Sequence, residues 1–455
     1  MIQNNNDDIV AIASAKGRGG IGIVRVSGTD VYSYMDGVLG KNINPRLAAY
    51  SKFLDSSGST IDEGIALYFP APSSFTGESV IEFHGHGGVV VLDALVARCV
   101  ELGARVARPG EFSERAFLND KIDLTQAEAI ADLIDASTVE AARSAVRSMQ
   151  GDFSLVVNQL VDDMIYIRMY VEAAIDFPEE EVDFLNDDLL LGKLNSLQQS
   201  LKDVLKLARQ GSLLKDGITL VLAGKPNSGK SSLLNALSGN ETAIVTPIAG
   251  TTRDVLRDQI LVNGLPVNIV DTAGLRESDD PIEKEGMARA WKEIELADRI
   301  LFLVDSSVDK EYELKKVWPE FYQRFPESNQ VVTLLLNKID ISGLQAGPYG
   351  KADNAFSISA TNKDGIDALV EDLHHGAGFD SVSEGVFSAR RRHLASLEAA
   401  LKLVTTGLNQ LQEAGAGELL AEDLRQAQFQ LSEITGQFTS DDLLGHIFSS
   451  FCIGK

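Results

Sequence analysis

Cysteine and long apolar runs are scarce in this sequence. Only Cys99 and Cys452 occur among the 455 residues, far apart from each other, so a disulfide scaffold or a thiolate zinc site is not expected. No uninterrupted apolar run approaches the roughly 18 residues that a membrane span needs. The opening MIQNNNDDIV also lacks the basic start and apolar core of a secretory signal. We therefore expect a cytoplasmic protein with no membrane segment.

Basic residues are also few, because 41 Lys and Arg stand against 66 Asp and Glu, a formal charge of −25. Such a charge repels phosphate backbones at long range. Any contact with nucleic acid must therefore use a local basic patch or a basic partner. Two clusters are candidates for RNA contact, with a solvated helix start as the equal alternative; they are Arg390, Arg391 and Arg392 in SARRRHL, and Arg105, Arg108 and Arg115.

The spacing of apolar residues changes along the chain and predicts a multidomain fold. Residues 1–120 mix short β-rich runs with one helical pattern, which predicts a small α+β domain. Residues 121–215 read as helices, and TQAE from Thr125 indicates a capping box. Residues 216–378 alternate strands and helices, as a parallel sheet with crossover helices does, and 379–455 are helical again. The economical interpretation is a discontinuous α-helical domain that carries an inserted α/β domain.

The segment GKPNSGKS, residues 224–231, fits G-x-x-x-x-G-K-[ST] and lies between a predicted strand and a predicted helix. Its glycines let backbone N–H groups surround phosphates, Lys230 reaches the outer phosphates, and the Ser231 hydroxyl binds Mg²⁺. The nucleotide contacts expected from this loop are Asn227, Ser228, Gly229, Lys230, Ser231 and Ser232.

Three later segments, each after a predicted strand, complete a site for GTP. In DTAG, Asp271 can hold the metal through water and the Gly274 amide can contact a γ-phosphate. In NKID, Asp340 can accept two hydrogen bonds from guanine that adenine does not offer. SISA follows as the loop behind the base. The further contacts expected here are Thr272, Ala273, Asn337, Lys338, Ser359 and Ala360. The order and context of the four motifs predict a Ras-like P-loop GTPase domain.

One position departs from Ras-type enzymes, since Leu275 stands where they carry the glutamine that orients the attacking water. Upstream, TPIAGTTRD offers Thr251 and Thr252 as the switch threonine that completes the Mg²⁺ shell. With these motifs, the chain resembles the MnmE (TrmE) family of tRNA-modification GTPases. The family-level signals are the stretch ARPGEFSERAFLNDKIDLTQAEAIADLIDA, the inserted GTPase domain and the terminal FCIGK. The resemblance extends over nearly the whole chain.

The resemblance implies which groups offset the developing charge and which residue orients the water in the absence of the glutamine. A K⁺ ion would stand where other GTPases place an arginine finger, with Asn227, Thr246, Ile248 and Thr251 at the matching positions. Mg²⁺ would be bound by Ser231 and Thr252, and Glu283 would orient the water. From charge pattern alone, Glu283 is one solvated acid among many in ESDDPIEKE.

The resemblance also implies that a one-carbon tetrahydrofolate, 5,10-methylene- or 5-formyl-tetrahydrofolate, binds in the N-terminal domain at a homodimer interface. The matching positions are Arg25, Glu82, Lys121 and Lys455. A glutamate can pair with the donor edge of a pterin, and the cations suit the glutamyl carboxylates of folate. Cys452 belongs to the matching CIGK tetrapeptide. Whether it acts as nucleophile, acid/base or positioning group stays open.

Two glycine-rich segments are interpreted as structural. KGRGGIGIVRVSG is predicted to be a turn entering a strand, since no strand-loop-helix context supports dinucleotide binding. HGHGG, with His84 and His86, is predicted to be a glycine-rich turn, because a metal site would need a third ligand.

The family resemblance implies that this GTPase, with an FAD-dependent MnmG-type partner, adds an aminomethyl-type group at C5 of the wobble uridine of certain tRNAs. Two alternatives remain. An Era- or Der-like ribosome-assembly GTPase would share the GTPase domain but would need an RNA-binding module such as KH, and no GXXG loop in that context is evident. A folate-binding dimer whose GTPase acts only as a conformational clock is the other.

Overall fold

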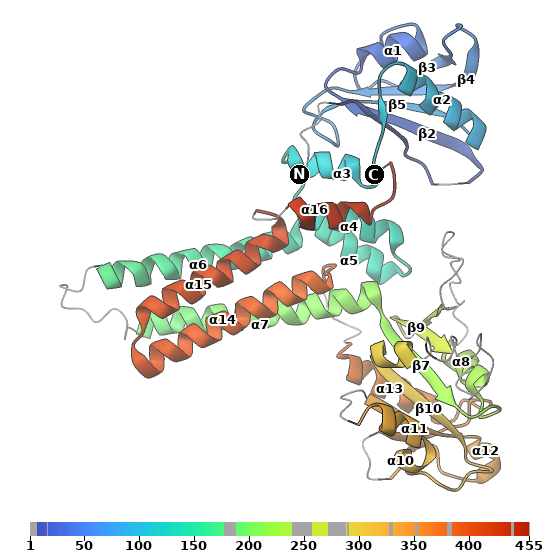
Figure 1. Ribbon diagram of the computed structural model, residues 1–455, viewed down its shortest axis with the longest axis vertical. Helices are drawn as coiled ribbons and strands as arrows, with labels where there is room; N and C mark the ends of the chain where they lie inside the picture. The colour runs from blue at the N-terminus through green and yellow to red at the C-terminus, as the bar shows by residue number, and fades with distance from the viewer. Residues whose placement is uncertain are drawn as a thin grey trace. The chain divides into compact units, whose positions relative to one another are not determined.

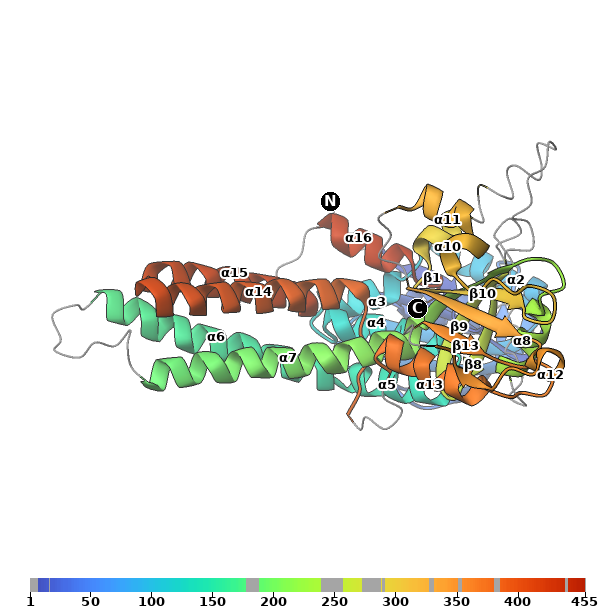
Figure 2. The ribbon, with the colours of Figure 1, turned by 90° about the horizontal axis from the view of Figure 1, so that it is seen from below.

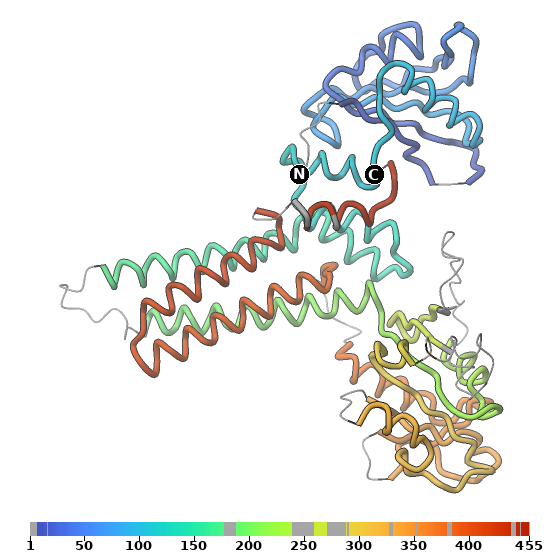
Figure 3. The backbone as a smooth tube through the Cα atoms, viewed as in Figure 1, coloured from blue at the N-terminus to red at the C-terminus, as the bar shows by residue number. Residues whose placement is uncertain are grey.

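The computed structural model describes residues 7–15, 17–176, 188–238, 257–271, 288, 291–326, 331–350, 354–379, 385–437 and 441–454. The course of the chain is drawn in Figures 1 and 3. It divides into two compact units, the first made of residues 1–135, 145–202 and 395–455, and the second of 136–144 and 203–394. No helix in the described ranges is long and apolar enough to cross a membrane.

The first unit begins with a six-stranded sheet in the order β3-β4-β5-β2-β1-β6. Helices α1 (Tyr32–Leu39) and α2 (Val89–Glu101) cover one face, where Val24, Ile81 and Phe83 are fully buried against them. The strands are β1 (Ile9–Ile12), β2 (Gly19–Gly28), β3 (Ala49–Leu54), β4 (Thr60–Phe69), β5 (Ser79–Gly87) and β6 (Arg105–Val106).

The other face of this sheet carries polar side chains. Arg25 pairs directly with Glu82 across β2 and β5, and His84 pairs with Ile23 on β2 and Ile65 on β4. Successive residues of a strand point to opposite faces, and directly paired residues share one. Arg25, Glu82 and His84 therefore lie on the face opposite the two helices. The glycine-rich segment before Arg25 enters β2, as predicted.

The helical part of the first unit joins segments that are far apart in the sequence. The Arg168 guanidinium donates to Gln428 at 2.8 Å, and the Gln198 amide donates to Thr405 at 2.9 Å. Figure 2 shows α6, α7, α14 and α15 side by side. The helices are α3 (Glu111–Leu118), α4 (Leu124–Asp135), α5 (Val139–Gln150), α6 (Asp152–Asp176), α7 (Asp188–Asp216), α14 (Arg391–Ala414), α15 (Gly417–Thr435) and α16 (Asp441–Ser449). Of these, α5, α7 and α14 each have a part in the second unit.

The predicted capping box is displaced by two residues. Helix α4 begins at Leu124, and Asp123 Oδ1 accepts from the Gln126 N–H at 2.9 Å while Gln126 Oε1 accepts from the Asp123 N–H at 3.0 Å. This reciprocal pair is a capping box. The prediction that Thr125 caps the helix was wrong, because Asp123 and Gln126 have the same spacing and come first.

The second unit contains a seven-stranded sheet in the order β12-β13-β11-β10-β7-β9-β8, in which β13, β11, β10, β7 and β9 are parallel. Helices α8 (Lys230–Ser238) and α13 (Ile366–Ala377) pack on one face; α11 (Pro319–Arg324) packs on the other, with α10 (Leu314–Val317) beside it. The strands are β7 (Ile218–Gly224), β8 (Arg257–Val262), β9 (Leu265–Asp271), β10 (Arg299–Asp305), β11 (Val331–Asn337), β12 (Gly347–Pro348) and β13 (Ala355–Ser357). The predicted parallel sheet is confirmed.

Candidate functional site

The phosphate loop follows β7 and ends at α8. Lys230, the first residue of α8, folds back so that its ammonium donates to the Gly224 carbonyl at 3.0 Å and the Lys225 carbonyl at 3.2 Å. Ser231 and Ser232 follow in the exposed first turn of the helix. Asn227 has a φ of 63°, a left-handed conformation that asparagine adopts more readily than most residues. The loop therefore turns between the end of β7 and the N-terminus of α8, the position at which P-loop proteins bind phosphate through backbone N–H groups.

Gly229 shows how closely this loop meets the guanine motif. It has a φ of 101°, and a Cβ there would lie 2.1 Å from the Asn337 Nδ2 atom. The same Asn337 amide donates to the Ser228 carbonyl at 2.8 Å, while its Oδ1 accepts from the Ala360 N–H at 3.0 Å. The buried Asn337 therefore ties the phosphate loop to the SISA loop.

The remaining guanine-motif residues extend from this asparagine. Helix α12 (Ile339–Ser342) begins after Lys338, whose φ is 67°. The Ser359 hydroxyl donates to Asp340 Oδ1 at 2.7 Å. These contacts bring the predicted residues of the phosphate loop, NKID and SISA together at the carboxyl ends of β7, β11 and β13, the edge where open α/β sheets bind ligands.

Several predicted site residues lie outside the described residues; they are Thr246, Ile248, Thr251, Thr252, Thr272, Ala273, Gly274, Glu283 and Lys455. The backbone of Asp271 ends β9, where it pairs with Leu222 of β7. The start of DTAG therefore lies one strand away from the phosphate loop, as the sequence predicts.

In the first unit, Glu82 lies between two partners on the open sheet face. Its Oε1 accepts from Arg25 Nε at 2.8 Å, and its Oε2 lies 2.9 Å from His84 Nε2. Burial by itself would raise the pKa of Glu82, but the hydrogen bonds from His84 and Arg25 bring the pKa below its usual range. Glu82 is therefore an oriented carboxylate that keeps its charge at neutral pH.

Two aromatic rings flank Arg25. Its Cζ lies 5.7 Å from the centroid of the buried Phe112 and 6.0 Å from that of Phe75, which is 37% exposed. Lys121 donates to the Pro72 carbonyl at 3.1 Å and so holds the loop that contains Phe75. No pattern in the sequence indicates either ring, because only the folded chain brings them to Arg25.

The C-terminal tail reaches the same part of the sheet. The Gly110 N–H donates to the Cys452 carbonyl at 3.2 Å. A Cβ on Gly454, whose φ is 96°, would lie 2.2 Å from the Ile12 carbonyl oxygen. Ile12 is next to Ala11, which pairs with Arg25. The exposed Cys452 therefore belongs to a tail that closes on the end of β1 near Arg25.

The arginine cluster near α3 is engaged in ion pairs. Arg105 contacts Glu111 at 2.7 Å, Arg108 contacts Glu114 at 3.1 Å, and the buried Arg115 contacts Glu78 at 2.9 Å. The carboxylates balance these charges, so the cluster is not an open cationic surface. Because the three arginines are paired with carboxylates, these contacts do not support the interpretation of the cluster as an RNA-contact patch. The sequence pattern did not show this, since part of the carboxylates come from distant segments.

The two histidines of HGHGG belong to strand β5, so the predicted glycine-rich turn was wrong. Gly85 and Gly87 of β5 lie where other segments of the chain come close. A Cβ added to Gly85 would lie 2.5 Å from Asp62 Oδ2, and one added to Gly87 would lie 2.6 Å from the Gly19 carbonyl oxygen. His86 Nδ1 lies 2.8 Å from Asp62 Oδ1. Among the described residues no group of three or more His, Cys, Asp or Glu could hold a metal ion.

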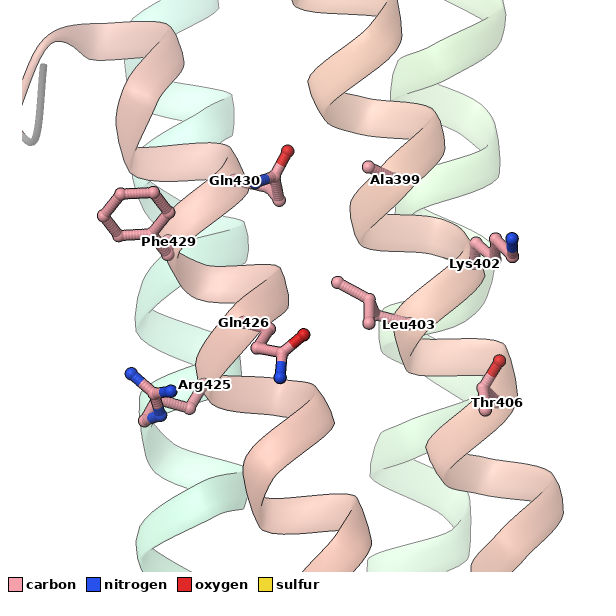
Figure 4. A pocket seen from close by; sticks show the side chains of 8 residues that line it. All are labelled: Ala399, Lys402, Leu403, Thr406, Arg425, Gln426, Phe429 and Gln430. Carbon is pink, nitrogen blue, oxygen red and sulfur yellow. The ribbon is translucent and has the colours of Figure 1, made fainter. Parts of the chain in front are cut away.

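A groove of about 630 Å³ lies between α14 and α15. Figure 4 shows Leu403, Gln426 and Gln430 directed into the space between these helices. Arg425 on its rim is paired with Glu422 at 2.8 Å. The mixed lining defines no chemistry, and we assign the groove no ligand.

The chain is similar to known proteins along nearly its whole length. Residues 8–121 match a family model described as GTP-binding protein TrmE N-terminus, and residues 124–452 match one described as MnmE helical domain. The tRNA modification GTPases MnmE of Yersinia pseudotuberculosis serotype O:1b and Pectobacterium carotovorum are 57% and 56% identical to it; each alignment covers 99% of this chain and 100% of the relative. A solved structure of an Era variant from Aquifex aeolicus with GDP and AlF₄⁻ is 27% identical, covering 41% of this chain and 66% of its own, with a TM-score of 0.27.

The parallel sheet and the motifs at its carboxyl edge define the class of protein, a P-loop GTPase that binds and hydrolyses GTP. The two family models and the full-length relatives define it further. The chain belongs to the MnmE family of tRNA modification GTPases.

Proposed function

We propose that this protein is a K⁺-dependent GTPase that acts with an FAD-dependent MnmG-type partner on the wobble uridine, position 34, of certain tRNAs. The two would use a tetrahydrofolate one-carbon unit to form aminomethyl or carboxymethylaminomethyl groups at C5. The observation that carries this proposal is the Arg25–Glu82 pair, which lies near a cysteine-bearing tail in a chain that also holds a GTP site.

The side chains on the open sheet face fit a folate. Glu82 is an oriented anion that can accept from the N–H groups on the pterin edge, and Phe75 offers a partly exposed ring for stacking. Arg25, with Lys121 and Lys455, would serve the glutamyl carboxylates. The bound folate would supply the one-carbon unit. This chain's residues would bind and orient it, and Cys452 would act next to it.

The GTP site fits its proposed cations where it is described. Ser231 presents a hydroxyl in the first turn of α8, where Mg²⁺ bound to the phosphates would lie. Asn227 is exposed in the phosphate loop, so its amide oxygen is available to K⁺. Such an ion would offset the charge that develops between the β- and γ-phosphates. The other proposed ligands are Thr246, Ile248 and Thr251 for K⁺ and Thr252 for Mg²⁺, with Glu283 positioning the water.

We also propose a homodimer with the folate site at its interface. Ile65, on the face of Glu82 and His84, is 42% exposed, and its cross-strand partner Tyr50 is 69% exposed. An open sheet face with exposed apolar side chains is typical of an association surface. The proposed domains are residues 1–120 for folate and dimerisation, 121–215 with 379–455 as the helical domain, and 216–378 as the GTPase domain.

Binding of 5-formyl-tetrahydrofolate tests the folate assignment most simply. Glu82→Gln keeps the size of the side chain but removes the anion, so we expect affinity to fall by about tenfold or more, as loss of a charge-assisted hydrogen bond does. Titration calorimetry measures it, with Glu101→Gln as the control, since Glu101 is an exposed acid that pairs with Arg98 on α2, on the other face of the sheet. Equal affinity in the Glu82→Gln variant would contradict the assignment.

The ribosome-assembly alternative makes a different prediction. An Era- or Der-like protein would have no need of a folate site. Loss of such a protein from the cell would alter ribosomal subunits and leave tRNA nucleosides unchanged. Membership of the MnmE family favours the tRNA reading.

A further inference from the structure

The strand order of the GTPase sheet places one unassigned acid where a nucleotide must cross. Strand β10 lies between β7, which leads to the phosphate loop, and β11, which ends in the guanine motif. All three are parallel, and Asp305 at the end of β10 pairs with Asn337 at the end of β11. A nucleotide with its phosphates on one loop and its base at Asp340 must pass over the end of β10.

Asp305 holds the lysine of the guanine motif at this crossing. Its Oδ2 accepts from Lys338 Nζ at 2.6 Å, and its Oδ1 accepts from the Ser307 N–H at 3.0 Å and hydroxyl at 2.5 Å. The Asp305 side chain is 18% exposed and that of Lys338 is 31% exposed. The Lys338 side chain therefore extends from the end of β11 towards the end of β10.

The rest of the loop after β10 fixes this acid in place. The Ser306 hydroxyl donates to the Asn337 carbonyl at 2.7 Å, and the Ser306 N–H donates to the same oxygen at 3.0 Å. Ser306 is fully buried and its hydroxyl also lies 2.8 Å from that of Ser342. The Asp305 carboxylate is thus attached by its neighbour to the segment that carries Lys338.

We propose that Asp305 is a positioning residue for guanine-nucleotide binding, because it holds Lys338 extended across the nucleoside part of the site. A free lysine side chain samples many rotamers, and fixing it before the ligand arrives removes an entropy cost from binding. The methylenes then form a preformed wall for the purine and sugar, and the ammonium is kept near the sugar. Asp305 touches Lys338 and acts through it. This inference rests on the GTPase class alone and is independent of the folate assignment.

Burial by itself would raise the pKa of Asp305, but the hydrogen bonds from Lys338 and Ser307 lower the pKa below its usual range. The Asp305 carboxylate is therefore charged at neutral pH. A neutral isostere at this position removes that charge and keeps the shape.

Asp305→Asn is the direct test, measured by titration calorimetry with unlabelled GDP, because a label on the ribose would occupy the crossing itself. We expect the Kd for GDP to rise about threefold to tenfold, within the range of a charge-assisted hydrogen bond that is partly exposed. GTP turnover at saturation should stay within about twofold, since Asp305 does not face the phosphates. The ratio of affinities for GDP and xanthosine diphosphate should not change, because Asp340 reads the base.

A double-mutant cycle separates positioning from general support of the fold. Lys338→Met keeps the methylenes and loses the ammonium, so adding Asp305→Asn to it should cause no further loss of affinity. Glu313→Gln is the matched control, because Glu313 forms a pair of the same length with Lys316, 2.6 Å, outside the phosphate loop and the guanine motif; it should bind GDP like the wild type. Unchanged affinity in Asp305→Asn would overturn the proposal. Full additivity with Lys338→Met, with a lower thermal unfolding midpoint, would assign Asp305 a structural role instead.

Discussion

At the scale of single residues, we expect base selection to depend on Asp340. The Ser359 hydroxyl donates to Asp340 Oδ1 at 2.7 Å and so orients a carboxylate that can accept from two guanine N–H groups. Asp340→Asn should lower the affinity for GTP by about a hundredfold or more and raise the affinity for xanthosine triphosphate, because the amide donates where the carboxylate accepts. Titration with both nucleotides measures this exchange. Equal weakening of the two would show that Asp340 does not read the base.

Cys452 is the second residue with a sharp expectation. It is exposed in the tail that closes near Arg25, in a different compact unit from the phosphate loop. Cys452→Ser should leave GTP turnover unchanged and abolish tRNA modification, because serine keeps the shape but not the thiol. Turnover assays and nucleoside analysis of the same variant test both halves. Full modification by Cys452→Ser would make the thiol a bystander.

Sequence patterns identified the nucleotide contacts that belong to motifs, since each comes at the end of a predicted strand. They missed Asp305, although it ends the buried run RILFLVD in the same way as Asp271 and Asn337. An acid closing a parallel strand was a usable signal. The sequence carries no such signal for Phe75 and Phe112, because their approach to Arg25 depends on the path of the loop that contains Phe75 and of α3.

At the scale of elements, contacts at the start of α3 make a pH-dependent contribution to the free energy of unfolding. Burial would raise the pKa of Glu111, but hydrogen bonds from Arg105 and the Arg108 N–H bring that pKa below its usual value. A lowered folded pKa stabilises the protein at neutral pH, and this contribution is lost as the pH falls through it. Glu111→Gln should therefore lower the free energy of unfolding at pH 7 by about 1–2 kcal/mol. The difference from wild type should shrink below about pH 4.5, the ordinary glutamate pKa.

Glu114, one turn further along α3, is the matched control with the opposite sign. Its burial raises its pKa, with Arg108 opposing the effect and Glu111 adding to it. Glu114→Gln should therefore lose less stability than Glu111→Gln at pH 7, and its difference from wild type should change in the opposite direction with pH. Urea unfolding at several pH values compares them. Parallel pH dependence for both variants would contradict the assigned shifts.

Element types were predictable where spacing is strong, and less so where long-range pairing decides. Apolar periodicity gave the parallel sheet, the helical segments and the strand entered after the glycine-rich KGRGG. The segment HGHG continues β5 because β2 pairs with it as far as Gly87, while β4 pairs with His84 on the other side. The arginines near α3 are held by carboxylates such as Glu78, 37 residues from Arg115, a distance that no local pattern reports.

At the scale of the whole molecule, Leu275 cannot orient the attacking water as the usual glutamine does, and the sequence offers no identifiable arginine finger to offset the developing charge. Both roles must therefore be filled by other groups. The proposed K⁺ at Asn227 would act mainly on charge that develops during hydrolysis. GTP turnover should therefore rise with K⁺, fall when Na⁺ replaces it at constant ionic strength, and drop about a hundredfold in Asn227→Ala. Nucleotide affinity should change little. Glu283→Ala should reduce turnover in saturating K⁺ as well. Equal rates in the two salts would refute the K⁺ mechanism.

The central claim is that the GTP site and the folate site of this chain serve one modification of tRNA. Mass spectrometry of nucleosides from the tRNA of cells lacking the protein tests it most directly. Aminomethyl and carboxymethylaminomethyl groups at C5 of the wobble uridine should disappear, and a copy of the wild-type gene should restore them while one encoding Glu82→Gln should not. Wobble uridines that keep these groups in cells without the protein would contradict the account.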